Sequence, residues 1–356
     1  MQKAIRNISP HLLEAVGQHD WQKSGPAYVV YNPTKEADWD LLRKYLRDAA
    51  MAASLPEPVW LETTAEDPGP GQTREALKAG ASVVIAAGGD GTVRAVAEVL
   101  AGTETPLGLL PVGTGNLLAR NLDFPLQSAK DLASIALTGS VKAIDVAWLE
   151  IDDSAVDSAL LQQAKAAELQ AVTPGKYAFV VIGGMGFDAD VMDSTNSALK
   201  KKVGWLAYVS AGMKNLFAEK MRVEIHPGDS GKRINTEARS VMFMNCGELT
   251  GGIVLEPNAD PADSWLELTV LDIKGGVLGW IDLVHTIMAK NMGFSERSLI
   301  PINSVVGDLD TRRVRTCTVK ADSLQAVQLD GDVLGYAKEF SVSLDPGALN
   351  VRVRKG

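Results

Sequence analysis

The sequence is poor in cysteine, with only Cys246 and Cys317 among 356 residues. A disulfide framework or a zinc site needs clustered Cys and His residues, so both are excluded and a reducing compartment, the cytoplasm, is expected. Long apolar runs are also missing, because the longest, such as residues 81–87, are far shorter than the ~20 residues that a bilayer requires. The first 20 residues carry charges and have no apolar core, so they do not predict a signal peptide.

Basic residues are outnumbered, with 35 Lys and Arg against 44 Asp and Glu and a formal net charge of -9. That sign opposes binding to a phosphate backbone, so nucleic acid is not expected as a partner. Hydrophobic residues make up 46% of the chain and charged residues 22%, which is typical of folded globular proteins. At roughly 150 residues per domain, the length predicts two domains.

The first predicted domain spans residues 25–145, where strand-like and helix-like segments alternate. The apolar run at residues 81–87 is typical of a strand buried on both faces of a parallel sheet. The β/α alternation predicts an open, mostly parallel sheet with helices on both faces. Strands are predicted at residues 27–31, 59–62, 81–87 and 107–110, and helices at residues 38–53, 73–78, 93–100, 117–122 and 128–137.

The second predicted domain, residues 146–345, has short strand-like segments bounded by Gly and Asp, which predict an antiparallel, β-rich, sandwich-like domain. Residues 152–172 predict an exposed helical or poorly ordered insertion, and residues 276–292 have apolar residues at helical spacing. Residues 346–356 form a C-terminal tail, for which a return to the first domain is left open. Strands are predicted at residues 146–151, 177–182, 221–225, 240–245, 266–272, 316–321, 326–329 and 339–343.

The strongest chemical signal is the run Gly88-Gly89-Asp90-Gly91-Thr92, between a buried strand and a helix. Phosphates need close approach to the backbone, which Gly permits, and N–H groups, which a helix N-terminus supplies. Asp90 adds a carboxylate for magnesium or for a sugar hydroxyl. The alternative is a tight strand-to-helix turn in which Asp90 or Thr92 only caps the helix.

Two further polar turns follow neighbouring strands. The run Gly113-Thr114-Gly115-Asn116 follows the strand at 107–110, and Asn32-Pro33-Thr34-Lys35 follows the strand at 27–31. Turns after neighbouring parallel strands lie at the carboxyl edge of one sheet, where open α/β folds bind ligands. Neither a Walker pattern nor a Gly-x-Gly-x-x-Gly fingerprint occurs at these turns, which disfavours P-loop and Rossmann sites.

Together these motifs resemble the diacylglycerol kinase catalytic domain, which bacterial diacylglycerol kinases share with sphingosine and ceramide kinases and with bacterial lipid-kinase relatives. The Gly-Gly-Asp-Gly-Thr run at 88–92 and the Pro-Val-Gly-Thr-Gly-Asn run at 111–116 carry this resemblance. It covers roughly residues 25–345, because later motifs follow in the order of the family. They are the runs at 183–189, 204–208, 257–263 and 329–332.

The resemblance implies an α/β plus β fold with the active site in a cleft between the two domains. It implies that Asp332 is the catalytic carboxylate, which takes the proton from a lipid hydroxyl, and that Asp90 acts in catalysis by orienting the magnesium of the nucleotide. It also implies a structural magnesium site made by Asp263 with backbone carbonyls near Asp260 and Trp265. Around ATP it places Asn32, Thr64, Gly88, Gly89, Asp90, Gly91, Thr92, Gly113, Thr114 and Asn116.

Some positions depart from the family pattern. Thr34-Lys35-Glu36 stands where a Ser-Gly pair is usual, and Asp263-Ser264 stands where Asp-Gly is usual, so Ser264 is less free to take a positive φ. Asp330-Gly331-Asp332 replaces Asp-Gly-Glu, which keeps a carboxylate but shortens its reach by one methylene. Without the family match, these two acids are typical of a β-hairpin turn.

These features predict a lipid kinase that depends on ATP and Mg²⁺, with conversion of diacylglycerol to phosphatidic acid as the expected reaction. The expected partner is a lipid at the membrane surface, on which a cytoplasmic enzyme docks transiently. The run Lys200-Lys201-Lys202 is either a solvated face or a contact with anionic headgroups. The alternatives are a kinase of a soluble hydroxyl substrate, like the NAD kinases, and a catalytically weak regulator that binds nucleotide or lipid. A homodimer is left open.

Overall fold

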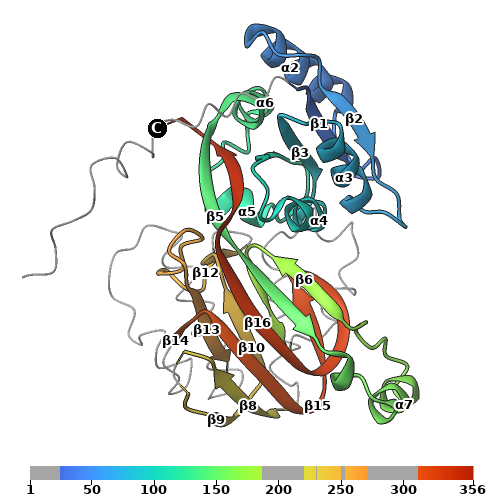
Figure 1. The fold of residues 1–356 in the computed structure, drawn as a ribbon, viewed down its shortest axis with the longest axis vertical. Helices are drawn as coiled ribbons and strands as arrows, with labels where there is room; N and C mark the ends of the chain where they lie inside the picture. Colours follow the sequence, from blue (N-terminus) through green and yellow to red (C-terminus); the bar gives the residue numbers. More distant parts are fainter. Residues whose placement is uncertain (1–24, 187–219, 230, 250–252, 272–311, 356) are drawn as a thin grey trace, which may run out of the picture.

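The structure is a computed structural model and describes residues 25–186, 220–229, 231–249, 253–271 and 312–355 (Figure 1). The molecule has an upper α/β half, coloured blue to teal, and a lower half of β-strands. The run at 204–208, the basic run at 200–202 and the helical pattern at 276–292 lie outside the described residues. Within the described ranges, none of the helices has the length and apolar character needed to cross a membrane.

The upper half is a parallel sheet in the order β4-β3-β1-β2. Its centre is β3, Val83–Gly88, in which every residue is buried, as the unbroken apolar run predicts. Helix α2 begins where the Asp38 carboxylate accepts the N–H of Leu41, which satisfies a free donor at the helix start. The other elements are β1 Ala27–Tyr31, α2 Trp39–Ala52, β2 Val59–Glu62, α3 Pro70–Lys78, α4 Asp90–Leu100, β4 Leu107–Pro111, α5 Leu117–Asn121 and α6 Ala129–Thr138.

The lower half is antiparallel and packs around a second core, in which the rings of Phe243 and Phe340 meet edge to face at 6.1 Å. The predicted insertion contains a 3-10 turn and helix α7, whose Leu160 and Ala164 are buried. The elements are β5 Ser140–Ile151, η1 Asp153–Ala155, α7 Ser158–Ala166, β6 Gly175–Phe179, β7 Ile182–Met185, β8 Met221–Pro227, β9 Ile234–Ala238, β10 Ser240–Met244, β11 Glu248–Leu249, β12 Ile253–Val254, β13 Leu266–Leu271, β14 Arg312–Val314, β15 Thr316–Leu329 and β16 Asp332–Val353.

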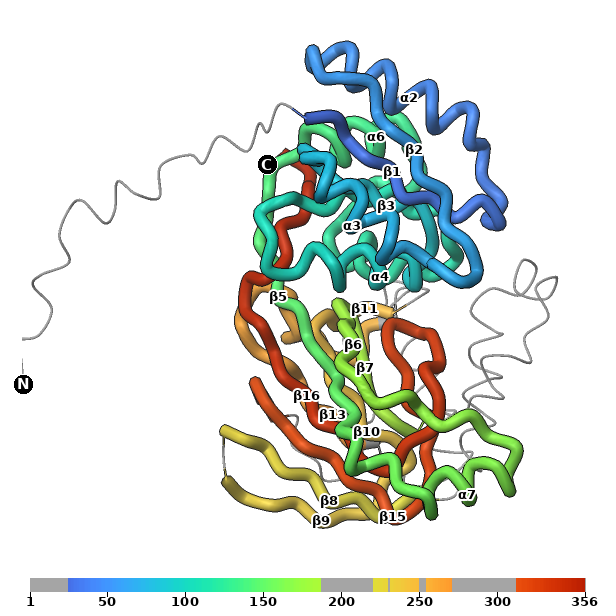
Figure 2. The backbone as a smooth tube through the Cα atoms, turned by 45° about the vertical axis from the view of Figure 1, so that its right-hand side comes forward, coloured from blue at the N-terminus to red at the C-terminus, as the bar shows by residue number. Residues whose placement is uncertain are grey.

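Two long strands, β5 and β16, run through both halves, as Figure 2 shows. They pair with each other in antiparallel fashion, and β16 also pairs in parallel with β4, where Val351 lies opposite Leu107. In the described part of the chain, the parallel and antiparallel strands therefore form one continuous sheet of 14 strands. The predicted fold class, a parallel α/β part followed by antiparallel β-strands, is confirmed.

Several boundaries differ from the sequence prediction for local reasons. The segment 177–182 is two strands, β6 and β7, because the N–H groups of Val180 and Val181 between them donate to the Asp330 carboxylate instead of to a neighbouring strand. The segments 316–321 and 326–329 belong to one strand, β15, which continues through a register shift. Helix α4 begins at Asp90 rather than at residue 93, so the second half of the first glycine run is helical.

Candidate active site

The first glycine turn joins the buried strand β3 to helix α4. A Cβ built on Gly88 would lie 2.4 Å from the Cβ of Thr92, so only glycine fits at the end of this strand. Thr92 is itself buried, with 6% of its surface exposed, and packs against Gly88. Gly89 precedes α4 in extended conformation, and the first N–H groups of the helix lack partners inside it. A helix N-terminus of this kind attracts anions such as phosphate.

The second glycine turn, between β4 and α5, lies directly against the first. The N–H of Val112 donates to the carbonyl of Gly88 at 3.0 Å, and a Cβ built on Gly113 would lie only 2.6 Å from the Cα of Gly89. Asn116 closes the turn, because its side chain accepts the N–H of Gly113 at 3.0 Å and donates to the Gly113 carbonyl at 2.9 Å. Thr114 is exposed at the tip of this turn.

Asp90 links the two glycine turns. Its Oδ2 accepts the N–H of Asn116 at 2.9 Å, and its Oδ1 accepts the N–H of Leu117 at 2.6 Å. Asp90 therefore caps helix α5, across the site. The alternative expected from the sequence, that Asp90 caps its own helix α4, differs from this arrangement. Burial raises the pKa of Asp90, the two backbone N–H groups oppose this effect, and the charge of Asp332 adds to it. Its contact with magnesium stays a prediction.

The third polar turn brings a lysine to the first glycine turn. The Asn32 side chain accepts the N–H and the hydroxyl of Thr34, at 3.0 and 2.7 Å, and thereby shapes the turn after β1. The Cε and Nζ of Lys35 lie 3.7 and 3.9 Å from the position that a Cβ of Gly89 would take. The sequence motifs assign no role to Lys35, although a cation directly after the first strand is the signal that points to it. Thr64 lies in an exposed turn after β2, where its hydroxyl accepts the N–H of Asp67.

Asp332 faces the first glycine turn from the lower half. It is the first residue of β16, after a tight turn in which Asp330 and Gly331 have φ of 49° and 93°. A Cβ built on Gly91 would lie 2.6 Å from Oδ2 of Asp332. The same oxygen lies 3.7 Å from a guanidinium nitrogen of Arg94, whose side chain is only 19% exposed against 57% for that of Asp332. The structure thus brings the predicted catalytic carboxylate and the predicted phosphate cradle together.

Arg94 is a second cation that the sequence did not single out. It lies in α4, one turn after Gly91, and its buried Nε has no hydrogen-bond partner among the described residues. Burial raises the pKa of the neighbouring Asp330, and the positive charge of Arg94 lowers it. Arg94 and Lys35 therefore contribute positive charge to a region that contains the three carboxylates Asp90, Asp330 and Asp332.

Asp330 anchors the hairpin that carries Asp332. It is 3% exposed, and its carboxylate accepts the N–H groups of Val180, Val181 and Ile182 at 3.0, 2.8 and 2.9 Å. Burial raises the pKa of Asp330 to about 6, against the three N–H groups and the charge of Arg94, which lower it. Because both of its oxygens face the protein interior, Asp330 acts as an anchor and leaves Asp332 as the acid that faces the glycine turn.

The stabilising effect of Asp330 is expected to fall as pH rises from about 4 to about 6. An unfolded Asp titrates near 3.9, so in this window the folded chain retains a proton that the unfolded chain has lost. The free energy of unfolding of the parent, relative to that of Asp330→Asn, should fall by roughly 2 kcal/mol between about pH 4 and pH 7. Denaturant titrations of both proteins measure this, and a difference that does not vary with pH would contradict the raised pKa.

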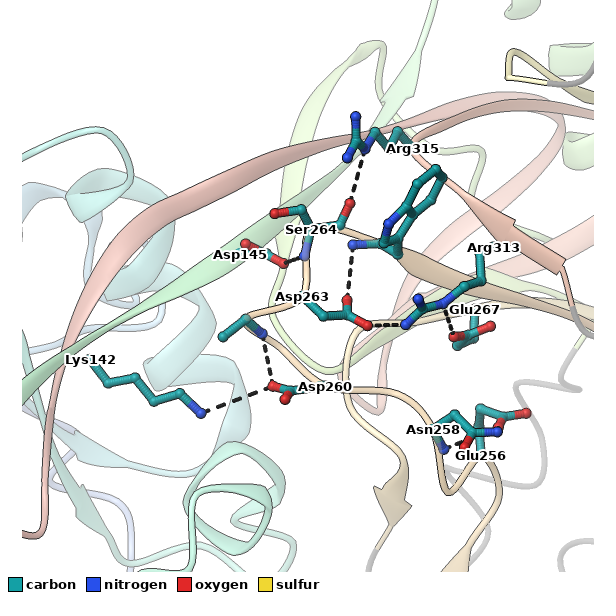
Figure 3. Close-up of polar contacts among 12 residues, drawn as sticks. Lys142, Asp145, Glu256, Asn258, Asp260, Asp263, Ser264, Glu267, Arg313 and Arg315 are labelled. Atoms are coloured by element: carbon teal, nitrogen blue, oxygen red, sulfur yellow. Dashed lines mark hydrogen bonds and ion pairs between the residues drawn. The ribbon is translucent and has the colours of Figure 1, made fainter. Parts of the chain in front are cut away.

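The loop predicted to hold a structural magnesium packs beside β13 and β14 (Figure 3). Asp263 accepts the N–H of Trp265 at 3.0 Å with Oδ1, and its Oδ2 forms an ion pair with the guanidinium of Arg313. Arg313 also donates from Nε to Glu267 at 2.8 Å. Asp260 uses one carboxylate oxygen to accept an N–H of its own loop.

These contacts do not fit a magnesium site. Mg²⁺ takes six oxygens in a near-octahedral shell, whereas a cation, the guanidinium of Arg313, already lies on Oδ2 of Asp263, and a backbone N–H donates to Oδ1. The carbonyl of Asp260 accepts the N–H of Asp263 at 3.2 Å, and Nζ of Lys142 lies 4.0 Å from the Asp260 carboxylate. Within the described ranges, no group of three or more His, Cys, Asp or Glu side chains could hold a metal ion.

Asp145 holds the same loop from the other side. It is 1% exposed, and its carboxylate accepts the N–H of Ser264 at 2.8 Å and the N–H of Gly347 at 2.7 Å. Ser264 has a φ of 66°, a left-handed conformation that costs a serine more than a glycine. Because Asp145 lies in β5 and Gly347 in β16, this carboxylate ties the loop to both strands that join the halves.

A hollow of about 500 Å³ in the lower half is not the candidate active site. It is lined by residues of β8, β9 and β15, and none of the glycine turns or the 330–332 hairpin contributes to it. Its charged groups are already paired, as in Arg222 with Glu237 and Lys320 with Glu339.

The site therefore combines two apposed glycine turns, the N-terminus of α4, two cations and a half-exposed carboxylate. Backbone N–H groups and cations of this kind hold phosphate oxygens, and a carboxylate within reach of them can accept a proton. An arrangement of this type at the carboxyl edge of a parallel α/β sheet is typical of the class of proteins that bind phosphate groups.

Comparison with known proteins gives the family. The model of the diacylglycerol kinase catalytic domain matches residues 26–149. A Pseudomonas aeruginosa protein named "Probable lipid kinase YegS-like" is 31% identical over 286 residues, which are 79% of this chain and 80% of that protein. The "Diacylglycerol kinase" of Mycobacterium tuberculosis is 30% identical over 199 residues, and that match spans about half, 56%, of its length. The chain belongs to the diacylglycerol kinase catalytic domain family, as its motifs predict.

A solved structure has the same fold. The crystal structure of a diacylglycerol kinase from Bacillus anthracis str. Sterne superposes with a TM-score of 0.65 at 21% identity, covering 93% of this chain and 97% of that one. At this identity the likeness concerns the fold, including the antiparallel half that the family model does not reach.

Proposed function

We propose that this protein is a lipid kinase that transfers the γ-phosphoryl group of ATP to a lipid hydroxyl, with diacylglycerol as substrate and phosphatidic acid as product. The observation that carries the proposal is the position of the Asp332 carboxylate beside Gly91, in the first glycine turn. Family membership supports it, because the matched relatives are named as a diacylglycerol kinase and a lipid kinase.

In this mechanism the protein mainly positions the reactants and neutralises charge, since phosphoryl transfer passes through a loose transition state. The phosphates of ATP lie on the two glycine turns, against the N-terminus of α4. The lipid hydroxyl approaches from the lower half, and Asp332 accepts its proton as the hydroxyl oxygen bonds to the γ-phosphorus and the bond to the β-phosphate oxygen breaks. Asp330 holds the hairpin so that Asp332 stays at the turn.

The carboxylates of Asp90 and Asp332 are oxygen donors of the type that Mg²⁺ prefers, and both lie at the glycine turns. Magnesium bound with the nucleotide would neutralise charge on the phosphates. The main role of Asp90 is to hold the two glycine turns together, because its oxygens accept the N–H groups of Asn116 and Leu117.

A transfer assay with [γ-³²P]ATP tests the proposal. The purified protein is incubated with diacylglycerol in mixed micelles, with sphingosine and ceramide micelles, and with NAD and sugar phosphates, and label in phosphatidic acid is the expected result. Label on a soluble acceptor would favour the NAD kinase-like alternative. A folded protein that binds ATP but labels no acceptor would favour a regulator.

Lys35 is expected to contribute to ATP binding. Its ammonium group lies above Gly89, where a nucleotide phosphate would rest, so Lys35→Ala should raise the KM for ATP by about tenfold with a smaller change in kcat. Lys35→Arg keeps the charge and should keep most of the affinity. Initial rates at varied ATP measure the effect, and an unchanged KM in the alanine variant would remove Lys35 from the phosphate site.

A further inference from the structure

We propose that an arginine takes the place of the structural magnesium in this chain. The guanidinium of Arg313 lies between the carboxylates of Asp263 and Glu267, as Figure 3 shows, and pairs with both. The Glu267 side chain is only 5% exposed, and a carboxylate this deeply buried requires a partner of opposite charge. Arg313 supplies that charge permanently, because a guanidinium does not lose its proton in proteins.

The sheet holds this arginine in place. Glu267 in β13 and Arg313 in β14 lie directly opposite each other in the antiparallel register. Directly opposed side chains of opposite charge are neighbours on one face of a sheet. The guanidinium reaches Asp263 as an extension of this cross-strand pair, so its position depends on the register of two paired strands and not on the loop.

A second arginine, in the bend between β14 and β15, contacts the same loop. Arg315 donates from Nε to the carbonyl of Ser264 at 3.1 Å, and its guanidinium stacks on the Trp265 ring at 4.4 Å from the ring centre. The N–H of Ser264 is taken by Asp145. An entering metal would have to displace a guanidinium from Asp263 and leave two like charges side by side.

With Arg313 in this position, the fold of the antiparallel half does not depend on divalent cations, so any magnesium requirement of the protein would lie with the nucleotide. This consequence does not depend on which substrate the protein phosphorylates, because it concerns the protein without ATP or lipid.

The first test uses the full-length chain without nucleotide. Its Tm is measured in EDTA and in excess MgCl₂, and binding of Mn²⁺, used as a probe for Mg²⁺, is measured by EPR. The expected results are equal Tm values and no tightly bound Mn²⁺. A Tm that falls in EDTA and is restored by Mg²⁺, or one equivalent of tightly bound Mn²⁺, would overturn the inference.

The second test removes the arginine. Arg313→Ala leaves Glu267 buried without its cation, so its Tm should fall by roughly 5 °C. The control Lys320→Ala breaks an exposed ion pair with Glu339 in the same half and should leave the Tm nearly unchanged. An Arg313→Ala variant as stable as the parent would overturn the inference. If that variant does not fold, Asp263→Asn decides. A small loss of Tm that is the same in EDTA and in MgCl₂ is expected, since Arg313 keeps its pair with Glu267. A Tm that rises with Mg²⁺ in the parent but not in Asp263→Asn would show a metal ligand and overturn the inference.

Discussion

Asp332→Asn is expected to lower kcat by about 10² to 10⁴-fold while leaving the affinity for ATP nearly unchanged. The amide fills the same space as the carboxylate but cannot accept the proton of the lipid hydroxyl. Because 57% of the Asp332 side chain faces solvent at the start of β16, the substitution should leave the fold and the Tm unchanged. Initial rates with labelled ATP and dispersed diacylglycerol measure kcat, and calorimetry measures ATP binding.

Two further variants serve as controls for the Asp332→Asn result. Asp332→Glu should be tolerated, because it restores the residue usual in the family and extends the carboxylate by one methylene. Asp345→Asn is a matched control, since it makes the same change on the same strand at a carboxylate whose partner is the Trp148 indole. If Asp332→Asn were as active as the parent, Asp332 would leave the mechanism and Asp90 would be the next base to test.

Gly113→Ala is expected to weaken ATP binding by at least about 100-fold, which corresponds to about 2.7 kcal/mol. The new Cβ would lie 2.6 Å from the Cα of Gly89, and because both positions are backbone, no side chain can move aside. The two turns must separate, which breaks the contact between Val112 and Gly88 and moves the phosphate-binding N–H groups. Calorimetry with ATP measures the loss.

A general loss of stability must be separated from this local effect. Gly102 has a φ of 76° and open space where a Cβ would be, so Gly102→Ala should cost about 1 kcal/mol of stability through backbone strain. Because Gly102 lies at the other end of α4, ATP binding should survive. Equal ATP affinities in the Gly113→Ala variant and the parent would show that phosphates do not rest on the apposed turns.

The sequence by itself determined the parallel half and the position of the glycine turns. Unbroken apolar runs alternate there with helical periods, and these patterns depend on near neighbours in the chain, so β1 and β2 match the predicted residues. The motif at 88–92 and the turn at 113–116 were recognisable for the same reason. Their role in binding ATP, and the role of Asp332, stay predictions until the variants above are measured.

The tertiary structure decided what depends on contacts between distant residues. Asp330 splits the segment at 177–182 into two strands from about 150 positions further along the chain, so no local pattern could show the break. Arg313 reaches the carboxylate of Glu267 through the register of two paired strands. Lys35 reaches Gly89 through the shape of the turn after β1. Neither register nor turn shape can be read from composition. The Asp90 carboxylate holds the second glycine turn by accepting the N–H groups of Asn116 and Leu117. These hydrogen bonds form only once the sheet has brought strands β3 and β4 side by side.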